Sequence, residues 1–324
     1  MKPPSNGKGL WMVLATAFAL RLVLILILPP STDVFYVNRE AVSTLLAGEN
    51  PYTHVFTSVP SCLMTPNSQD VYAYLPSTLL FYLPFYFIDL RVGNAVADLL
   101  VALSIYLIRR ELFGDGGILA PAIYLFFPPF VLFTSYYSNN VAIPASFALL
   151  SIYMLLKGRE GLAGLFFGIS LSSLQLSFPL LPLLFYYCLK KGTLKPIYIS
   201  LLTFSAIVIP FFAQNPDEFV RDVLLFQLQR PPLPFLSEKA LNLSLSGLLM
   251  PLGVGIPLSI RAVLTAIPLI FLFPLSTRPK GLVLSLAIFS SLSTFLLPNE
   301  VFAHYYLIPF SLYLAGLEKL KYIT

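Results

Sequence analysis

The chain has 324 residues, of which 57% are hydrophobic and only 11% are charged. Soluble domains carry roughly a quarter charged residues, so this composition excludes a soluble protein, and its continuous apolar runs are unlike the alternating strands of a β-barrel. The net charge of +5 comes from short basic clusters between apolar runs, a pattern of cytoplasmic loops that argues against nucleic-acid binding.

The first apolar run, residues 10–28, predicts an uncleaved membrane span. It is longer than a typical signal-peptide core, and no small-x-small cleavage motif follows it. Lys2 and Lys8 precede the run and favour a cytoplasmic N-terminus. A first outer loop then extends over residues 29–91.

Asp33 is the main catalytic candidate of this first outer loop. It follows the end of the first span by a few residues and precedes the aromatic pair Phe35 and Tyr36. A carboxylate held at an apolar boundary tends to have a perturbed proton affinity, which suits a general base. The alternative is a residue that only ends the helix. Residues 38–46 predict a short amphipathic surface helix, which Gly48 ends.

Two further apolar runs, residues 75–88 and 241–257, are interrupted by proline or glycine, so we expect re-entrant or interfacial helices there instead of spans. This choice places most basic residues on one side of the membrane, as the positive-inside rule requires. The predicted fold is all-α and polytopic, with about ten transmembrane helices in one integral membrane domain over residues 1–324. Residues 214–259 are expected to form a second outer loop. The other expected spans cover residues 92–108, 118–135, 139–156, 161–177, 178–189, 196–212, 260–275, 281–297 and 305–317.

Arg21 and Asp98 are charged residues inside the first two expected spans. A charge in lipid is costly, so it usually faces a partner or a wet cavity. Two interpretations stay open. Either the two residues pair and pin their helices together, or Arg21 touches an anionic lipid headgroup.

Several basic and aromatic side chains are expected near the outer membrane interface. His304, at the outer end of the last span, is placed to meet a phosphate as a cation or a donor, whereas His54 is expected to be a bystander. Arg91, Arg230 and Arg261 lie near the same interface. The aromatic candidates for a sugar and acceptor groove are Tyr36, Tyr52, Tyr72 and Tyr74. For any single tyrosine the alternative is the ordinary aromatic belt of a membrane protein.

The order of these features carries a family resemblance. A first span with Arg21 is followed by the exit residue Asp33, by Gly48-Glu49-Asn50-Pro51-Tyr52, and by Tyr72-Ala73-Tyr74-Leu75-Pro76 before an apolar helix. This order resembles the GT-C superfamily, polytopic glycosyltransferases that use polyprenyl- or dolichyl-phosphate sugars. Residues 94–106 and 295–313 are similar to spans of the GPI mannosyltransferase I catalytic subunit and its relatives.

The resemblance implies an inverting transfer of a hexose, with mannose favoured, from a polyprenyl-phosphate sugar to a glycan, lipid or protein acceptor on the outer face. Asp33 is then the catalytic base or the group that activates the acceptor. Many relatives carry a second acid two residues later, where this chain has Phe35. A divalent metal therefore stays open, and no cofactor is certain.

The leaving phosphate calls for nearby cations or donors. The candidates to bind it are Arg21, Arg91, Arg230, Arg261 and His304. Asn50 joins the four tyrosines as a candidate residue of the substrate groove.

Two other functions remain as alternatives to an enzyme. The first is a transporter or lipid flippase, which would show an internal repeat and acids near the bilayer midplane. The second is a non-catalytic subunit of a glycosylation complex, because the acidic motif is reduced to a single Asp. The expected location is a plasma membrane, with a prokaryotic one favoured. Both termini are then cytoplasmic, and the active site is on the extracytoplasmic face.

Overall fold

The computed structural model describes residues 7–60, 71–114, 117–226, 234 and 241–318. The regular elements of this described part are all helices, which confirms the all-α fold class. The long axis of the molecule is built by α1 (Gly7–Ile27), α4 (Leu90–Phe113), α5 (Leu119–Phe126), α6 (Pro128–Ser135), α7 (Ala142–Leu156), α8 (Glu160–Leu171), α9 (Leu181–Lys190), α10 (Lys195–Phe212), α14 (Leu258–Ala266), α15 (Leu269–Leu275), α16 (Pro279–Leu296) and α17 (Leu307–Gly316).

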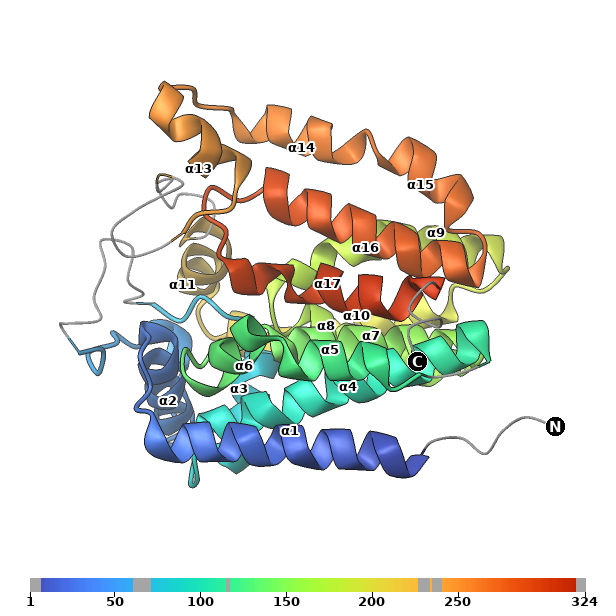
Figure 1. The fold of residues 1–324 in the computed structure, drawn as a ribbon. Coiled ribbons are helices and arrows are strands. Elements are labelled where there is room, and N and C mark those ends of the chain that lie inside the picture. The colour runs from blue at the N-terminus through green and yellow to red at the C-terminus, as the bar shows by residue number, and fades with distance from the viewer. Residues whose placement is uncertain (1–6, 61–70, 115–116, 227–233, 235–240, 319–324) are drawn as a thin grey trace.

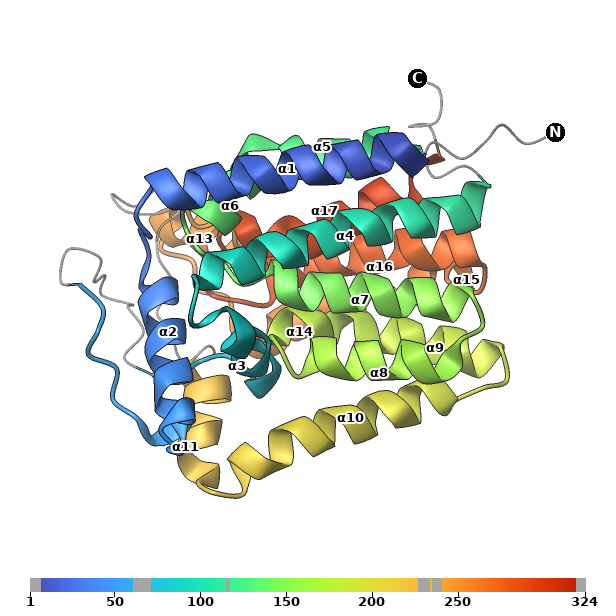
Figure 2. The same cartoon turned by 90° about the horizontal axis from the view of Figure 1, so that it is seen from below.

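Short elements gather mainly at one end of this bundle, which we call the α2 end after α2 (Asp33–Leu46). Figure 1 shows α2, α11 and α13 at this end, whereas α1 begins and α17 finishes toward the other end. Figure 2 shows α2 lying across the bundle axis. The remaining short elements are η1 (Pro51–Thr53), α3 (Pro76–Tyr82), η3 (Leu83–Phe85), η4 (Gln175–Leu180), α11 (Pro216–Val220), η5 (Arg221–Leu225), α13 (Leu245–Leu249), η6 (Met250–Leu252) and η7 (Ala303–Tyr306).

Five helical segments of the described chain are long and apolar enough to cross a membrane. They are α1, α4, α10, the continuous run of α14 and α15, and α16. The other expected spans are shorter or broken. Helices α7 and α8 have 15 and 12 residues, and α5 ends at Phe126, two residues before Pro128 begins α6. The multi-pass architecture is therefore shown, and the number of crossings stays a prediction.

The two runs that were predicted not to cross contain only short helices, and whether they cross stays a prediction. Helices α3 and η3 together cover ten residues from Pro76 to Phe85, or about 15 Å, half of the roughly 30 Å hydrocarbon thickness. Serine and threonine hold α3 in place: the Ser77 amide donates to the Ser172 carbonyl at 2.8 Å, and the Thr78 hydroxyl donates to the Ser173 carbonyl at 2.7 Å. These bonds satisfy buried polar groups where the helical pattern is interrupted.

Arg21 and Asp98 form a fully buried ion pair between α1 and α4, with 2.9 Å between Arg21 Nε and Asp98 Oδ2. The Tyr124 hydroxyl donates to the other Asp98 oxygen at 2.6 Å, and Arg21 Nη2 donates to the Leu125 carbonyl at 3.1 Å. Of the two interpretations of these charges, the structure confirms the one in which they pin helices together. A buried pair needs such extra hydrogen bonds to offset its desolvation.

Helices α8 and α10 approach closely because α8 presents glycines to α10. A Cβ atom on Gly164 would lie 2.5 Å from the Pro196 carbonyl oxygen, and one on Gly168 would lie 2.6 Å from the Ser200 carbonyl oxygen. Small residues four apart on one helix face allow this backbone contact in membrane bundles. The contact fixes α10 along its length, and the end of α10 leads directly to α11 at the α2 end.

Candidate functional site

Asp33 is the first residue of α2 and is half-buried at the α2 end. The two residues before it are tied to the loop between α6 and α7: the Ser31 amide donates to the Tyr136 carbonyl at 3.3 Å, and the Thr32 hydroxyl donates to the Tyr137 carbonyl at 2.5 Å. One Asp33 oxygen accepts the amide of Val34 at 2.9 Å. No cation of the described chain pairs with this carboxylate, so one oxygen is available to a substrate.

The position of Asp33 agrees with the electrostatics of a helix start. The N-terminus of a helix carries a partial positive charge and stabilises an ionised carboxylate there. Asp33 therefore stands at a favourable place for a carboxylate, without a neighbouring cation of the described chain that would compete for its oxygens.

Arg91 holds the elements around Asp33 together and has no donor left for a ligand. Its guanidinium donates to the carbonyls of Ile25 and Leu28 at the end of α1, to the Ser135 carbonyl at the end of α6, and to the Asp89 carboxylate. These contacts use Nε and both terminal nitrogens. The expected role of Arg91 as a phosphate ligand is thus replaced by a structural one.

Phe35, two residues after Asp33, is packed under Arg91. Its side chain is buried, and the Arg91 guanidinium lies 5.8 Å from its ring centre. Within the described ranges, no three His, Cys, Asp or Glu side chains lie close enough to hold a metal ion. The described residues therefore do not fit a divalent metal at Asp33.

The tyrosines predicted to line a groove form a packed aromatic core instead. Tyr52 and Tyr72 are fully buried, and Tyr74 is nearly so. The Tyr52 hydroxyl donates to the Tyr74 carbonyl at 2.8 Å, and the Tyr72 hydroxyl donates to Asn38 Oδ1 at 3.2 Å. Burial raises the pKa of Tyr52 and of Tyr72 well above the usual range. Tyr72 ties this aromatic core to Asn38 of α2. The residue type alone did not reveal that these tyrosines are buried and do not line a groove.

Asn50 and Tyr36 have different surroundings from that core. Asn50 begins η1, where its side-chain oxygen accepts the Tyr52 amide at 3.1 Å, and its buried Nδ2 has no partner within the described ranges. Tyr36 is half-buried, and its ring lies edge-on to that of Phe35 at 5.4 Å. Tyr36 therefore differs from the other three tyrosines predicted to line the groove. It lies on α2, three residues after Asp33, and its side chain is only partly buried.

Glu40 and His54 form a clamp on the side of α2. The Glu40 carboxylate accepts bonds from His54 Nε2 at 2.8 Å, from the Ser58 amide at 2.9 Å and from the Thr57 amide at 3.2 Å. Partial burial raises the pKa of Glu40, but the hydrogen bonds from Ser58, His54 and Thr57 outweigh it, so this pKa lies below its usual value. His54 is thus used to hold the chain after η1 against α2.

His304 lies in η7 among aromatic rings and is not a cation at neutral pH. Its ring stacks on Phe302 at 5.7 Å and meets the edges of Phe133 at 5.7 Å and Tyr305 at 4.6 Å. Burial lowers the pKa of His304 to about 3. The expected cationic contact with a phosphate is therefore corrected, although the neutral ring can still donate one N–H.

Among the described arginines predicted to bind the phosphate, Arg261, in the first turns of α14, keeps a donor without a partner. Its side chain is 4% exposed. Nη1 donates to the Ser246 hydroxyl at 3.1 Å and to the Leu297 carbonyl at 2.7 Å, whereas Nε is buried and has no partner among the described residues. Arg21 is occupied by Asp98, and Arg230 lies outside the described residues.

A polar network that the sequence analysis did not predict is centred on Asn242. The Asn242 side chain accepts the amides of Ser244 and Val301 at 3.1 and 2.9 Å and donates to the Asn299 carbonyl at 3.1 Å. It joins the segment before α13 to the segment after α16. The sequon Asn242-Leu243-Ser244 was its only signal, and Asn242 is fully buried, so it is not an exposed glycosylation acceptor.

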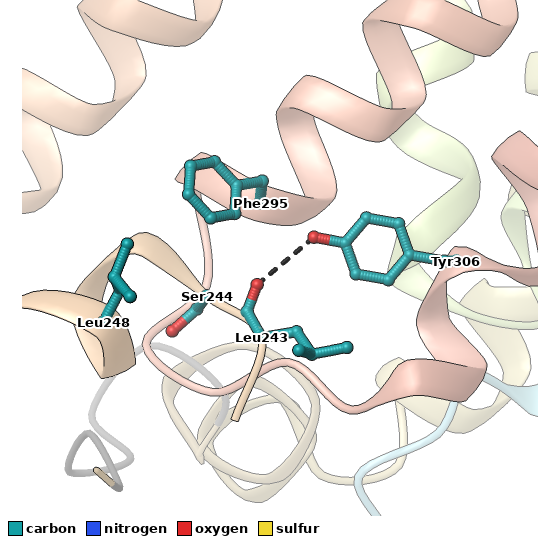
Figure 3. A pocket seen from close by; sticks show the side chains of 5 residues that line it. All are labelled: Leu243, Ser244, Leu248, Phe295 and Tyr306. Carbon is teal, nitrogen blue, oxygen red and sulfur yellow. Dashed lines mark hydrogen bonds between the residues drawn. The ribbon is translucent and has the colours of Figure 1, made fainter. Parts of the chain in front are cut away.

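Helix η7 connects the neighbourhood of Asp33 with the Asn242 network. The ring centre of Phe133 lies 6.2 Å from that of Tyr137 and 5.7 Å from that of His304. The Tyr306 hydroxyl donates to the Leu243 carbonyl at 3.2 Å (Figure 3). These contacts run from the loop after α6, which holds Ser31 and Thr32, through η7 to the segment before α13. Figure 1 shows α14, which carries Arg261, on the far side of α16 and α17 from α2. Arg21 contacts Asp98 instead.

The comparisons with known proteins support the fold. No protein-family model and no curated protein matches the chain. Two crystal structures of ArnT from Cupriavidus metallidurans are similar to this chain. The one bound to undecaprenyl phosphate has a TM-score of 0.59 and 14% identity, and the match covers 97% of this chain and 60% of that chain. The one in the apo state has a TM-score of 0.59 and 16% identity, and the match covers 99% of this chain and 61% of that chain. The chain thus spans about 60% of the length of these structures. They confirm an all-helical membrane fold similar to that of ArnT and do not bear on the resemblance to the GPI mannosyltransferase.

Proposed function

We propose that this chain is a multi-pass membrane glycosyltransferase that moves a sugar from a polyprenyl-phosphate donor to an acceptor hydroxyl at the α2 end. The observation that carries the proposal is a half-buried carboxylate, Asp33, without a competing cation in the described chain, at the exit of the first span. The fold in which it sits is that of ArnT, crystallised with undecaprenyl phosphate.

Asp33 accepts the proton of the acceptor hydroxyl in this reaction. The acceptor oxygen attacks the anomeric carbon from the face opposite the phosphate, and the bond between that carbon and the phosphate oxygen breaks. The bonding electrons leave with the phosphate, so the sugar configuration inverts. Proton transfer to a positioned carboxylate typically contributes about 10²- to 10⁴-fold to a rate.

Among the described candidates for the leaving phosphate, Arg261 keeps one donor without a partner in the described chain, its buried Nε. Preorganised donors stabilise the charge that develops on a leaving group. The charge pattern supports an extracytoplasmic α2 end, since Lys157, Lys190 and Lys191 follow helices that run toward the other end. The chain's resemblance to mannosyltransferases makes mannose the first sugar to test.

The test is sugar transfer by the purified full chain in lipid nanodiscs. The donors are polyprenyl-phosphate mannose, glucose and arabinose, supplied with mixed lipid and peptide acceptors. We expect Asp33→Asn to lower the rate by about 10²-fold or more, because a general base is lost. Glu49→Gln, an exposed acid at the same end, is the matched control and keeps the wild-type rate. Equal rates for wild type and Asp33→Asn would contradict the proposal.

A non-catalytic subunit is the second candidate, and the packed Phe35 at the position of the second acid favours it. A subunit of this kind binds the donor lipid but transfers no sugar alone, and Asp33→Asn leaves the activity of its complex unchanged. A transporter is supported by no observation, since the midplane acid Asp98 is used in an ion pair.

A further inference from the structure

The described acids at the end of the bundle opposite the α2 end are used by neighbouring side chains. Lys157 pairs with Glu111 at 2.7 Å, and Lys280 approaches Glu318 at 3.4 Å. The third such acid, Glu160, accepts a threonine hydroxyl from the turn after α9 at 2.9 Å. The other exposed lysines and arginines of this end therefore have no carboxylate partner within the described ranges.

Two of these exposed cations, Lys190 and Arg278, follow the two rings of an aromatic pair that joins α9 to α15. The rings of Tyr186 and Phe273 lie 4.7 Å apart, and Figure 1 shows the two helices at this end. Lys190 comes four residues after Tyr186, and its Nζ lies 5.4 Å from the centre of that ring. Arg278 comes five residues after Phe273, directly before α16. Both cations therefore lie just beyond the aromatic pair, at the same end of it.

An exposed apolar strip runs beside the same aromatic pair. Leu189, three residues after Tyr186, is 50% exposed, and Ile270, three residues before Phe273, is 68% exposed. Because α9 and α15 run in the same direction, the helical periodicity places Leu189 and Ile270 on one side of the pair. The continuous segment of α14 and α15 is long and apolar enough to cross a membrane, and only 17% of it is buried. This strip therefore faces lipid, next to the two cations.

We propose that the junction of α9 and α15 binds one anionic phospholipid of the bilayer, with its phosphate between Lys190 and Arg278 and an acyl chain along Leu189 and Ile270. The argument is complementarity in charge and polarity. A free anion would use only the cations, and a lipid without net charge would leave them uncompensated, whereas an anionic phospholipid uses both parts of the site. The site lies at the opposite end of the bundle from Asp33, so it goes beyond the proposed function.

The two cations are suited to different parts of a lipid headgroup. The Lys190 ammonium lies over the Tyr186 ring, which holds a compact charge at the edge of the bundle without neutralising it. Arg278 offers a planar set of donors that matches two phosphate oxygens at once. A phosphate held by both side chains links α9 to the turn between α15 and α16. The lipid is therefore expected to fasten the sparsely buried segment of α14 and α15 to the bundle.

The test is photocrosslinking of the full chain in phosphatidylcholine nanodiscs that contain a small fraction of phosphatidylglycerol with a diazirine on one acyl chain. Peptide mapping should find the label within residues 185–190 or 269–278. The double variant Lys190→Gln/Arg278→Gln is expected to lower labelling about ten-fold or more, since each basic group near a bilayer surface strengthens binding of an anionic lipid about five-fold. The matched control Lys157→Gln/Arg159→Gln removes two exposed charges from the same end and keeps wild-type labelling.

Several outcomes would overturn the site. Full labelling of Lys190→Gln/Arg278→Gln or a label that maps elsewhere would remove it, and an equal loss in both double variants would show a general attraction to the basic end. Equal labelling by a phosphatidylcholine probe would exclude the role of charge, and complete competition by glycerol phosphate would indicate a site for free anions. Size-exclusion profiles confirm that the variants are folded. Asp33→Asn keeps wild-type labelling, so this result does not depend on sugar transfer.

Discussion

Three arginines of the bundle differ in what their guanidinium groups contact. Arg21 pairs with Asp98, Arg91 donates to carbonyls of α1 and α6 and to Asp89, and Arg261 keeps a donor unused within the described chain. The sequence marks all three as charges near or inside spans and cannot rank them. Their roles depend on which carbonyls and carboxylates the fold brings within reach, and these partners come from distant parts of the chain.

Arg21→Met is expected to destabilise the protein, because it leaves Asp98 buried without its ion partner. Breaking one side of a buried pair typically lowers the free energy of unfolding by about 3–5 kcal/mol. Thermal unfolding in detergent measures the effect, and the double variant Arg21→Met/Asp98→Leu should recover part of the loss. Donor binding by the folded fraction should stay unchanged. Lost donor binding with an unchanged melting temperature would restore the interpretation in which Arg21 touches a headgroup.

Tyr72→Phe is expected to affect stability and not substrate binding, since its ring is fully buried and its hydroxyl bonds to Asn38. Loss of one such hydrogen bond typically lowers the free energy of unfolding by about 1 kcal/mol. Chemical or thermal denaturation gives this value, and the KM for donor and acceptor should match wild type. A raised KM without a change in stability would return Tyr72 to the substrate groove.

His304 makes the stability of the protein sensitive to acid. Its pKa is about 3 in the folded chain and 6.5 ordinarily, so the unfolded chain binds more protons between these values. The stabilising contribution of neutral His304 is therefore complete above pH 6.5 and is lost as the pH falls toward 3, by up to about 1.4 kcal/mol per pH unit. Melting temperatures at pH 7.5, 6 and 5 should fall more steeply for wild type than for His304→Phe. Parallel curves would show that His304 is already charged when folded.

At the scale of elements, the sequence predicts most helices and both interrupted segments. Prolines and glycines in residues 75–88 and 241–257 interrupt the helical pattern, and the structure has only short helices there. What the patterns could not supply is how these segments dock. The hydrogen bonds of Ser77 and Thr78 to Ser172 and Ser173, just after α8, link positions 95 apart in sequence. The hydrophobic periodicity within one helix carries no information on a contact between residues so far apart in the sequence.

Gly168→Ala is expected to push α10 away from α8. The new Cβ would lie 2.5 Å from Thr203 Cβ and 2.6 Å from the Ser200 carbonyl oxygen. Overpacking of this kind typically lowers the free energy of unfolding by about 1–3 kcal/mol. Gly161→Ala, on the same helix, is the control, since its nearest new neighbour would be Ile199 Cδ1 at 3.9 Å. Equal melting temperatures for the two variants would mean that α10 is free to shift.

At the scale of the whole molecule, charge patterning sets the expected orientation. Basic residues follow α7 and α9, and the acids Asp33, Glu40 and Glu49 lie at the α2 end. The exit Asp and the helical fold were therefore predictable from the sequence, since spacing and composition encode both. The packed tyrosines, the Asn242 network and the junction of α9 and α15 were not, because each is made by segments that meet only in the folded bundle.

The predicted orientation can be tested with single cysteines in a chain whose native Cys62 and Cys188 are changed to Ser. Glu49→Cys at the α2 end and Lys191→Cys at the other end are both exposed. A membrane-impermeant maleimide added to intact cells should label Glu49→Cys alone, because the α2 end is expected outside. Labelling of Lys191→Cys alone would invert the topology and place the transfer reaction in the cytoplasm.

The ion pair between Arg21 and Asp98 also has a consequence for biogenesis. Asp98 follows Arg21 by 77 residues, so the ribosome needs about 4 to 15 s to synthesise the partner after the first span. During that interval α1 carries an uncompensated charge whose insertion into lipid costs about 2.5–3.5 kcal/mol. The first span is thus expected to remain beside the insertion machinery until α4 arrives, and the two helices should leave it as a pair.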